Sequence, residues 1–452
     1  MLRALTTTLL AVPLLSTTVL SPACAENWPH WRGEGGNSVS TTATPPTSWS
    51  PTENIRWKVK LPGRGSGSPV IWENRVFVTS AVPVPQRTAQ TVSFTQPPQR
   101  GQRGQRDRGG RGRGGSAPLP TLEFRVFCYD RSSGKLLWDQ LATVAKPHEG
   151  THSTNGFASA SPCTDGECVY AHFGSRGLFC YSMDGELKWK RDDFGRMATR
   201  ATFGEGSSPT IAGDAIIVPW DHEGPSALYA LNKKTGRTLW KTERDEPTCW
   251  ATPLIIEQDG RQQIVMNGQN NARAYDLKTG QELWRCGGQT QRPVACAVSA
   301  DGLVFVGSGF RGSFLGAFRP DGSGDIAGTP RVAWSVNRDT PDIASPVLSD
   351  GRLYFHKGKT GVISCLDAAS GRTLFGPSRV PGLNSIYASP VAAGGHVYLT
   401  GRSGTTVVIK DAAGFEIVST NSVGETVDAT PAPVDSELFI RGEQHLFCIA
   451  AD

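Results

Sequence analysis

The sequence predicts an all-β protein, an eight-bladed β-propeller built from four-stranded antiparallel blades. One observation is a recurring pair in which a small residue precedes proline; the prolines of consecutive pairs lie 47, 44, 44 and 41 residues apart, and twice 93. A second is a glycine followed four residues later by an aromatic residue near the end of most units. A period of this length is typical of one propeller blade per unit. The seven pairs are Ser68-Pro69, Ser161-Pro162, Ser208-Pro209, Thr252-Pro253, Ser345-Pro346, Ser389-Pro390 and Thr430-Pro431.

The two longer gaps bring the number of units to eight. One gap contains a low-complexity insert, and the other contains a unit that has lost its proline, around Val294-Ala295-Cys296-Ala297. Stacked repeats share one continuous core, so residues 54–452 are expected to form a single domain.

Each unit is expected to be a four-stranded meander. In the sixth unit the pattern predicts strands at 344–348, 352–356, 362–367 and 372–375, separated by turns that contain glycine. The recurring glycine allows a positive φ in the third turn, and the aromatic residue is a large apolar plate suited to packing between blades. The predicted docking residues are Trp57, Trp138, Trp189, Trp240, Trp284 and Phe375.

The two ends of the chain are expected to share one blade. The eighth unit stops at Asp452, after its third strand, and residues 55–60 before the first Ser-Pro pair have the pattern of the missing fourth strand. Trp57 in that segment supplies the plate that the last unit lacks. Pairing the terminal strands closes the ring and leaves it without an open edge.

The segment before the propeller has the pattern of a secretory signal. Arg3 precedes an apolar run, and Ala23-Cys24-Ala25 fits the small-residue cleavage rule, so residues 1–25 are predicted to be removed and residues 26–53 to form an N-terminal extension. A lipoprotein would begin at Cys24, but Ser21 and Pro22 do not fit the preceding motif. No later stretch approaches the ~20 apolar residues of a membrane span. We therefore expect an exported protein, periplasmic or extracellular.

The net charge of +5 does not indicate a nucleic-acid partner. Six arginines and one aspartate between residues 99 and 115 account for the whole excess, which leaves the rest of the chain close to neutral. This run belongs to an insert at residues 81–120 of the first blade, which is predicted to be disordered. The insert is either a basic tether for anionic surfaces or an expanded loop without a role.

Nine cysteines remain after the predicted cleavage. Cys128, Cys180, Cys365 and Cys448 occupy a repeat position where other units carry alanine, which indicates a small buried packing slot. Cys163 and Cys168 flank an Asp165-Gly166 turn. They are predicted to face each other across a hairpin and to form a disulfide, since export favours oxidation.

The phrase Ala-x-Asp-x-x-x-Gly-(Lys/Arg)-x-x-Trp resembles the tryptophan-docking repeat of pyrroloquinoline-quinone-type propellers. It runs from Ala274 to Trp284 and, with small changes, from Ala230 to Trp240 and from Cys128 to Trp138. The resemblance covers residues 54–452, and the opening from Trp28 to Gly33 is similar to the start of exported proteins of this class. The family contains quinone-dependent dehydrogenases and the outer-membrane assembly lipoprotein BamB, which is a binding scaffold.

The departures from the dehydrogenases favour the scaffold. The chain has no adjacent cysteine pair and no Cys-x-x-Cys-His haem motif, and no calcium-ligand set can be placed by motif. The resemblance thus implies an exported, non-catalytic, monomeric binding protein of the bacterial cell envelope, without a cofactor, whose partner is an envelope protein or polymer. Two alternatives stay open. One is an oxidoreductase that uses a cluster of His, Glu and Asp residues at the channel mouth, either with pyrroloquinoline quinone and a divalent cation or with a metal alone. The other binds carbohydrate through the rim aromatics Trp220, Trp250 and Tyr387.

Residues 148–152 match the His-Glu-x-x-His pattern of zinc proteases. That chemistry requires a helix, so that both imidazoles lie on one face. Pro147 and Gly150 instead indicate a loop between blades, and a protease is not expected.

The loops at one end of the channel carry the candidate ligand-binding residues. Connections between blades and the turns between second and third strands lie on the same face of a propeller. Converging carboxylates and imidazoles there suit a divalent metal or a polar ligand; alternatively they form a hydrogen-bonded network that stiffens the rim. The candidates are His148, Glu149, His152, Glu205, Asp221, His222, Glu223, Asp245, Glu246, Trp250 and Arg311.

Overall fold

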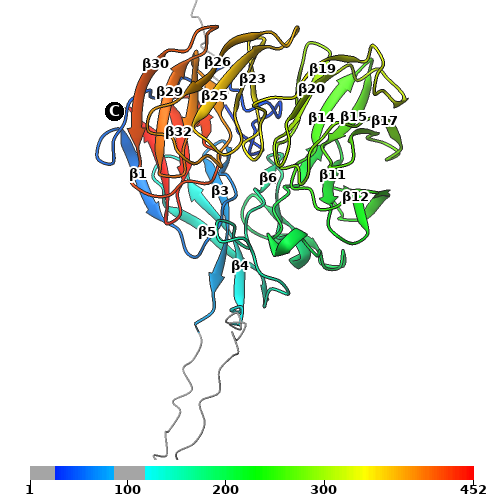
Figure 1. Ribbon diagram of the computed structural model, residues 1–452. Coiled ribbons are helices and arrows are strands. Elements are labelled where there is room, and N and C mark those ends of the chain that lie inside the picture. The colour runs from blue at the N-terminus through cyan, green and yellow to red at the C-terminus, as the bar shows by residue number, and fades with distance from the viewer. Residues whose placement is uncertain (1–25, 86–117, 452) are drawn as a thin grey trace, which may run out of the picture.

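The computed structural model describes residues 26–85 and 118–451 and confirms the predicted fold. Eight antiparallel sheets surround one axis, and the chain passes through them in order (Figure 1). The helical elements in these ranges are two short 3-10 turns, η1 (Gly174–Arg176) and η2 (Arg200–Thr202), neither of which could cross a membrane.

Each blade has four strands, the first of which lies nearest the axis. Blade 1 contains β2 (Val70–Trp72), β3 (Arg75–Pro83), β4 (Leu122–Asp130) and β5 (Leu136–Ala145). Blade 2 contains β6 (Cys163–Thr164), β7 (Cys168–His172), β8 (Leu178–Ser182) and β9 (Leu187–Arg191). Blade 3 contains β10 (Thr210–Ala212), β11 (Ala215–Trp220), β12 (Ser226–Asn232) and β13 (Thr238–Arg244). Blade 4 contains β14 (Leu254–Gln258), β15 (Arg261–Met266), β16 (Ala272–Asp276) and β17 (Glu282–Cys286), with the short β21 (Gly324–Asp325) parallel to β17.

The second half of the ring repeats this order. Blade 5 contains β18 (Val298–Ala300), β19 (Leu303–Ser308), β20 (Phe314–Phe318) and β22 (Val332–Val336). Blade 6 contains β23 (Val347–Ser349), β24 (Arg352–His356), β25 (Val362–Asp367) and β26 (Thr373–Arg379), which lie close to the strands predicted for this unit. Blade 7 contains β27 (Val391–Ala393), β28 (His396–Thr400), β29 (Thr405–Lys410) and β30 (Ile417–Ser422). Blade 8 contains β31 (Ala432–Val434), β32 (Glu437–Arg441), β33 (His445–Ala450) and β1 (Ile55–Lys60).

The ring closes as predicted, with strands from both ends of the chain in blade 8. Strand β1 pairs antiparallel with β33, and Trp57 lies opposite Cys448. The sheet order is β1-β33-β32-β31, so the N-terminal strand takes the outermost place. Backbone hydrogen bonds of this ladder hold the first and last strands together, which makes the ring a closed structure.

Tryptophans of the outer strands pack on glycines of the following blade. A Cβ atom at Gly134 would lie 2.8 Å from the Trp57 ring, and the φ of Gly134 is +69°, so both space and backbone require glycine there. The indole Nε1 of Trp57 donates to the carbonyl of Arg131 at 2.8 Å. The same arrangement recurs for Trp138 on Gly185, Trp189 on Gly236, Trp240 on Gly280 and Trp334 on Gly371.

Three docking positions differ from this scheme. The spacing rule did not predict Trp334 as a docking residue, because the residue four positions before it is Pro330 and not glycine. Trp284 is fully buried and donates to the side chain of Gln263, while β21 covers the outer edge of its strand. Phe375 lies against Phe415 of the next blade, with the ring centroids 5.5 Å apart.

The small residues before the prolines form a closed ring of eight hydrogen bonds around the axis. In each case the backbone N–H of one blade donates to the side chain of the equivalent residue in the next blade, over 2.8–3.2 Å. In blade 5 the acceptor is the Sγ of Cys296, 3.1 Å from the N–H of Thr252. We call this the axial ring; its members are Ser68, Ser161, Ser208, Thr252, Cys296, Ser345, Ser389 and Thr430.

The N-terminal segment, residues 26–54, crosses the end of the channel opposite the rim loops. It lies near the centre of the ring, in blue, in Figure 1. The side chain of Trp31, in this segment, reaches the axis and packs on Cys296. Hydrogen bonds join the segment to six blades, through Ile71, Thr164, Ser299, Pro346, Ala392 and Asp435. The channel is therefore closed at this end.

Two sequence expectations about blades 1 and 2 need correction. The insert was placed at 81–120, but β3 continues to Pro83, opposite Leu122, because Ala81 and Phe124 belong to a buried cluster. The expected Cys163–Cys168 disulfide is absent, since Cys163 lies opposite Tyr170 and both thiols are free. Residues 1–25 and 86–117, which carry the predicted signal and the basic run, lie outside the described residues.

Candidate ligand pocket at the channel mouth

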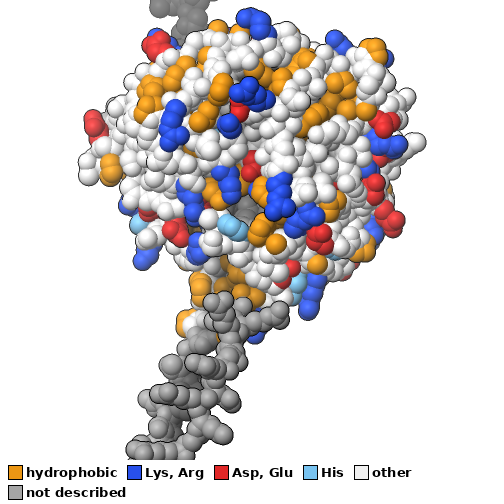
Figure 2. Space-filling model, viewed as in Figure 1, with side chains coloured by type: hydrophobic (Ala, Val, Ile, Leu, Met, Phe, Trp, Pro, Cys, Tyr) orange, Lys and Arg blue, Asp and Glu red, His pale blue; other side chains and the backbone are white. Residues whose placement is uncertain are grey.

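The channel opens on the rim face into a cavity of about 450 Å³. Figure 2 shows a hollow near the centre of this face, with Lys and Arg side chains around it. The axial ring and Trp31 form its floor, and loops of several blades form its wall. Five aromatic side chains line it: Trp31, Phe203, Trp250, Phe310 and Tyr387. A cavity of this size that combines aromatic side chains with convergent polar groups is the usual form of a small-molecule site.

Arg292 is the buried cation of this pocket. Its guanidinium lies 3.6 Å from the ring centroid of Phe310, and the residue is 7% exposed. One terminal nitrogen is 3.4 Å from Asp342, whereas the buried Nε has no partner among the described residues. Burial lowers the pKa of Arg292, and Asp342 opposes that shift. The φ of Arg292 is +46°, a conformation that few residues other than glycine adopt.

The other charges of the pocket add to its positive character. Lys359 lies 5.7 Å from the ring centroid of Tyr387 and forms no ion pair with a described residue. Arg402 lies 5.3 Å from the same ring and pairs with Asp428 at 2.9 Å. Burial raises the pKa of Asp428, and Arg402 opposes that shift. Two cations thus line the cavity: Arg292, which has a 3.4 Å contact with Asp342, and Lys359, which pairs with no carboxylate of the described residues.

The structure separates the eleven predicted residues into four groups. His152 and Trp250 line the axial pocket. His148, Glu149 and Glu205 lie together beside it, and their ligand atoms are within 4.8 Å of one another. Arg311 is exposed near Phe310. The others, which join the loops of blades 3 and 4, are Asp221, His222, Glu223, Asp245 and Glu246.

The group of His148, Glu149 and Glu205 is held by protein donors. Glu205 accepts the N–H and the hydroxyl of Ser175, both at 2.6 Å, and pairs with Arg176 at 3.0 Å. Glu149 accepts the hydroxyl of Thr199 at 2.5 Å. The Arg176 guanidinium already supplies a positive charge where a metal ion would be needed, so this geometry favours a structural network.

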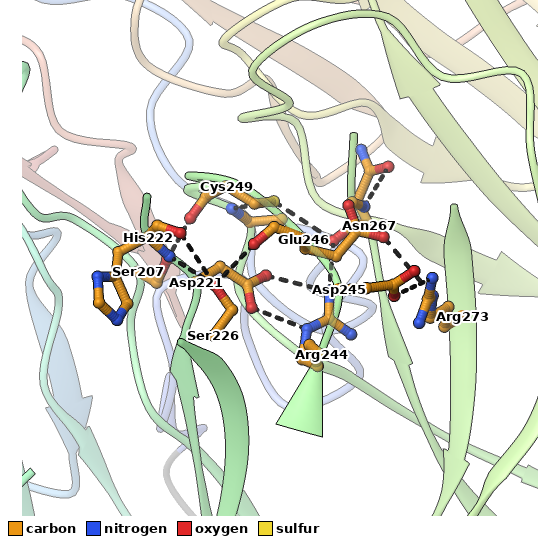
Figure 3. A network of polar contacts seen from close by, with 12 residues as sticks. Ser207, Asp221, His222, Ser226, Arg244, Asp245, Glu246, Cys249, Asn267 and Arg273 are labelled. Atoms are coloured by element: carbon orange, nitrogen blue, oxygen red, sulfur yellow. Dashed lines mark hydrogen bonds and ion pairs between the residues drawn. The ribbon is translucent and has the colours of Figure 1, made fainter. Parts of the chain in front are cut away.

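A buried ion pair lies at the centre of the network between blades 3 and 4 (Figure 3). Arg244 contacts both oxygens of Asp221, at 2.8 and 3.0 Å, and its third nitrogen donates to the hydroxyl of Tyr275. Both charged side chains are at most 1% exposed. Burial alone lowers the pKa of Arg244, but Asp221 and Tyr275 outweigh it and hold that pKa well above its ordinary value.

The remaining predicted residues tie neighbouring loops together. Nδ1 of His222 accepts the N–H of Ala198, and Glu223 accepts the hydroxyl of Thr248. Glu246 accepts the backbone N–H groups of Asn270 and Asn271. Asp245 pairs with Arg273 at 2.5 Å. These contacts satisfy loop backbone groups, as expected for a rim that is stiffened by side chains.

Sequence reasoning missed Arg292, Lys359 and the ring hydroxyls. Arg292 and Lys359 lie in loops without a repeat signal. The ring residues were noticed only because they are small and precede proline. A useful signal would have been that seven of the eight ring positions carry a hydroxyl group.

Two buried histidines predict a loss of stability in mild acid. His172 and His356 are 2% and 1% exposed, and burial lowers the pKa of each to about 4. As pH falls below 6.5, both histidines become protonated in the unfolded chain but stay neutral in the native state. The free energy of unfolding should therefore fall between pH 6.5 and 4, by at most about 3 kcal/mol per histidine.

Urea unfolding at pH 7.5 and 4.5 measures this loss. His356→Asn should show a smaller drop than the wild type, whereas His396→Asn, at a partly exposed site, should keep the full drop. Equal drops in the wild type and His356→Asn would contradict the assignment.

The fold and the site define a class of protein, a closed propeller with a dead-ended axial pocket. The family model described as outer membrane protein assembly factor BamB matches residues 123–375, more than half of the chain. This chain belongs to that family.

The similar proteins include dehydrogenases as well as a BamB protein. Methanol dehydrogenase subunit 1 of Methylorubrum extorquens is 27% identical over 155 residues, 29% of this chain and 23% of its own length. The chain thus spans about a quarter of that curated relative. The quinohemoprotein alcohol dehydrogenase of Comamonas testosteroni has a similar structure (TM-score 0.60, 10% identity, 95% of this chain and 81% of that one). BamB of Moraxella catarrhalis gives a TM-score of 0.49 at 13% identity, over 71% and 91% of the chains.

Proposed function

We propose that this protein is an exported binding propeller of the cell envelope and that it holds a small organic anion in its axial pocket. Membership of the BamB family and the signal-like N-terminus support the scaffold role and the export. The rim carboxylates Glu149, Glu205 and Glu246 accept hydrogen bonds from loop donors, which supports binding rather than catalysis.

The observation that carries the proposal is the cation Arg292 on the wall of the cavity, whose contact with Asp342 is long, at 3.4 Å. An anionic ligand could add a shorter, charge-assisted hydrogen bond to this guanidinium. Lys359 provides a second cation on the same wall. Phe203 and Trp250, 6.4 Å apart between ring centroids, provide an apolar wall for a flat ligand body.

A quinone-dependent oxidoreductase is the second candidate, favoured by the partial match to methanol dehydrogenase. A quinone held with a divalent cation needs carboxylates directed at that cation. Of the residues that line the axial pocket, the carboxylate belongs to Asp428, which already pairs with Arg402. The lining residues therefore do not fit a cation-assisted quinone.

The carbohydrate alternative loses one of its three aromatics. Trp220 is 3% exposed and packs against Phe194 at 5.3 Å between ring centroids. Trp250 and Tyr387 do line the pocket, but its cations Arg292 and Lys359 suit an anion better than a neutral sugar.

Titration calorimetry with 2-naphthoate tests the proposal, because this probe has a flat apolar body and one carboxylate. We expect binding to the wild type and at least roughly tenfold weaker binding to Arg292→Met, since a charged hydrogen bond contributes about 1.5–3 kcal/mol. Arg285→Met, at an exposed position on β17, is the matched control and should bind like the wild type. Absence of binding, or equal binding by Arg292→Met, would reject the pocket as the ligand site.

A further inference from the structure

The geometry points to a specific head group for the ligand: we infer that the axial ring binds a tetrahedral oxyanion, the phosphate or sulfate group of a small molecule. The inference rests on the proposed function and deepens it. It depends on which acceptors are within reach of the hydrogen atoms of the ring hydroxyls.

Each ring side chain already accepts one hydrogen bond, from the backbone N–H of the neighbouring blade. A hydroxyl group has one proton to donate in addition to its acceptor sites. None of the seven ring hydroxyls donates to a protein acceptor within residues 26–85 and 118–451. Six of these residues are 3–5% exposed and Ser345 is 1% exposed, and all seven line the axial cavity. A group inside the cavity could therefore accept the proton of each of these hydroxyls.

The groups next to the ring are donors as well. Arg292 and Lys359 line the wall of the same cavity and can donate from their charged ends. The cavity thus combines seven O–H donors on its floor with two cations on its wall.

A floor of donors selects a ligand group that only accepts. A sugar hydroxyl brings a proton of its own for every oxygen, so it can satisfy fewer of these donors than a group that carries acceptors alone. A phosphate or sulfate group presents three or more acceptor oxygens in different directions, so it can contact several hydroxyls and a guanidinium at once. A carboxylate has two oxygens in one plane and satisfies fewer of these donors.

The cysteine of the axial ring suggests a substitution that weakens hydrogen-bond donation by the ring without disturbing the fold. At Cys296 a sulfur accepts the N–H of Thr252, so cysteine can take a ring position, while a thiol is a weaker donor than a hydroxyl. Ser389→Cys should keep the ring acceptor and weaken the donor. Cys296→Ser should add an eighth hydroxyl.

Titration calorimetry with inorganic phosphate, phenyl phosphate and benzoate at equal ionic strength tests the inference. We expect phosphate to bind the wild type, Ser389→Cys to bind it roughly threefold to tenfold more weakly at unchanged thermal stability, and Cys296→Ser to bind it more tightly. Ser133→Cys, in an exposed turn of blade 1, should match the wild type.

These probes distinguish a phosphate monoester from free phosphate as the ligand. They also distinguish a failure of the oxyanion site from a failure of the proposed function. Stronger binding of phenyl phosphate than of phosphate supports a phosphate monoester, and the reverse supports the free ion. Binding of benzoate and 2-naphthoate without binding of either phosphate overturns the oxyanion site and leaves the anion pocket standing. If no anion binds, the proposed function fails as well.

Discussion

Replacing Asp221 by asparagine should lower the free energy of unfolding by about 3–5 kcal/mol, the usual cost of removing one partner of a buried ion pair. The side chains of Asp221 and Arg244 are at most 1% exposed, and Arg244 would keep its charge without a counter-ion. Urea unfolding at pH 7.5, followed by tryptophan fluorescence, measures the change.

Two variants control for this result. Asp221→Asn combined with Arg244→Met should recover part of the lost stability, because the unpaired buried charge is gone. Asp193→Asn breaks an exposed pair with Arg191 and should cost less than about 1 kcal/mol. If Asp221→Asn costs as little as Asp193→Asn, the pair does not stabilise the junction of blades 3 and 4.

Trp57→Ala should also cost about 3–5 kcal/mol, the range for truncating a large buried aromatic. Trp57 is 8% exposed, packs on Gly134 of blade 1 and donates to Arg131, so its loss opens a cavity at the junction that closes the ring. The same unfolding assay measures the loss, and limited proteolysis should show earlier cleavage near β1.

Leu239→Ala is the matched control for Trp57→Ala, because Leu239 also lies on an outer strand but is 53% exposed. It should change the stability by less than about 0.5 kcal/mol. A Trp57→Ala protein as stable and as protease-resistant as Leu239→Ala would show that blade 8 does not depend on this contact.

The repeat pattern predicted the fold because the relevant information is local. Gly134 and its equivalents mark turns that need a positive φ, and the tryptophan four residues later marks the plate that covers the next such turn. The spacing of the small-residue–proline pairs gives the number of blades, and the unfinished last unit predicts that β1 joins β33. The method failed at Trp334, where Pro330 replaces the marker glycine.

The rim residues show the limit of this reasoning. Loop positions in the repeat correctly place His152 and His222 on the same face, since both bond to the loop of residues 198–203. They do not reveal that Arg176 pairs with Glu205 or that Arg244 pairs with Asp221, because those partners come from other loops and strands. Several of the carboxylates proposed as metal or ligand groups therefore have hydrogen-bond donors from neighbouring loops within reach, which the repeat pattern does not indicate.

The sequence by itself determined the eight blades, their order and the shared terminal blade, because backbone preference and repeat spacing are written along the chain. Only the tertiary structure decided where the ligand pocket lies. The axial ring, Trp31 and Arg292 meet because eight inner strands and the N-terminal segment converge on one axis. The direction in which each hydroxyl and guanidinium then points depends on neighbours in other blades, 41 to 362 residues away along the chain for the axial ring.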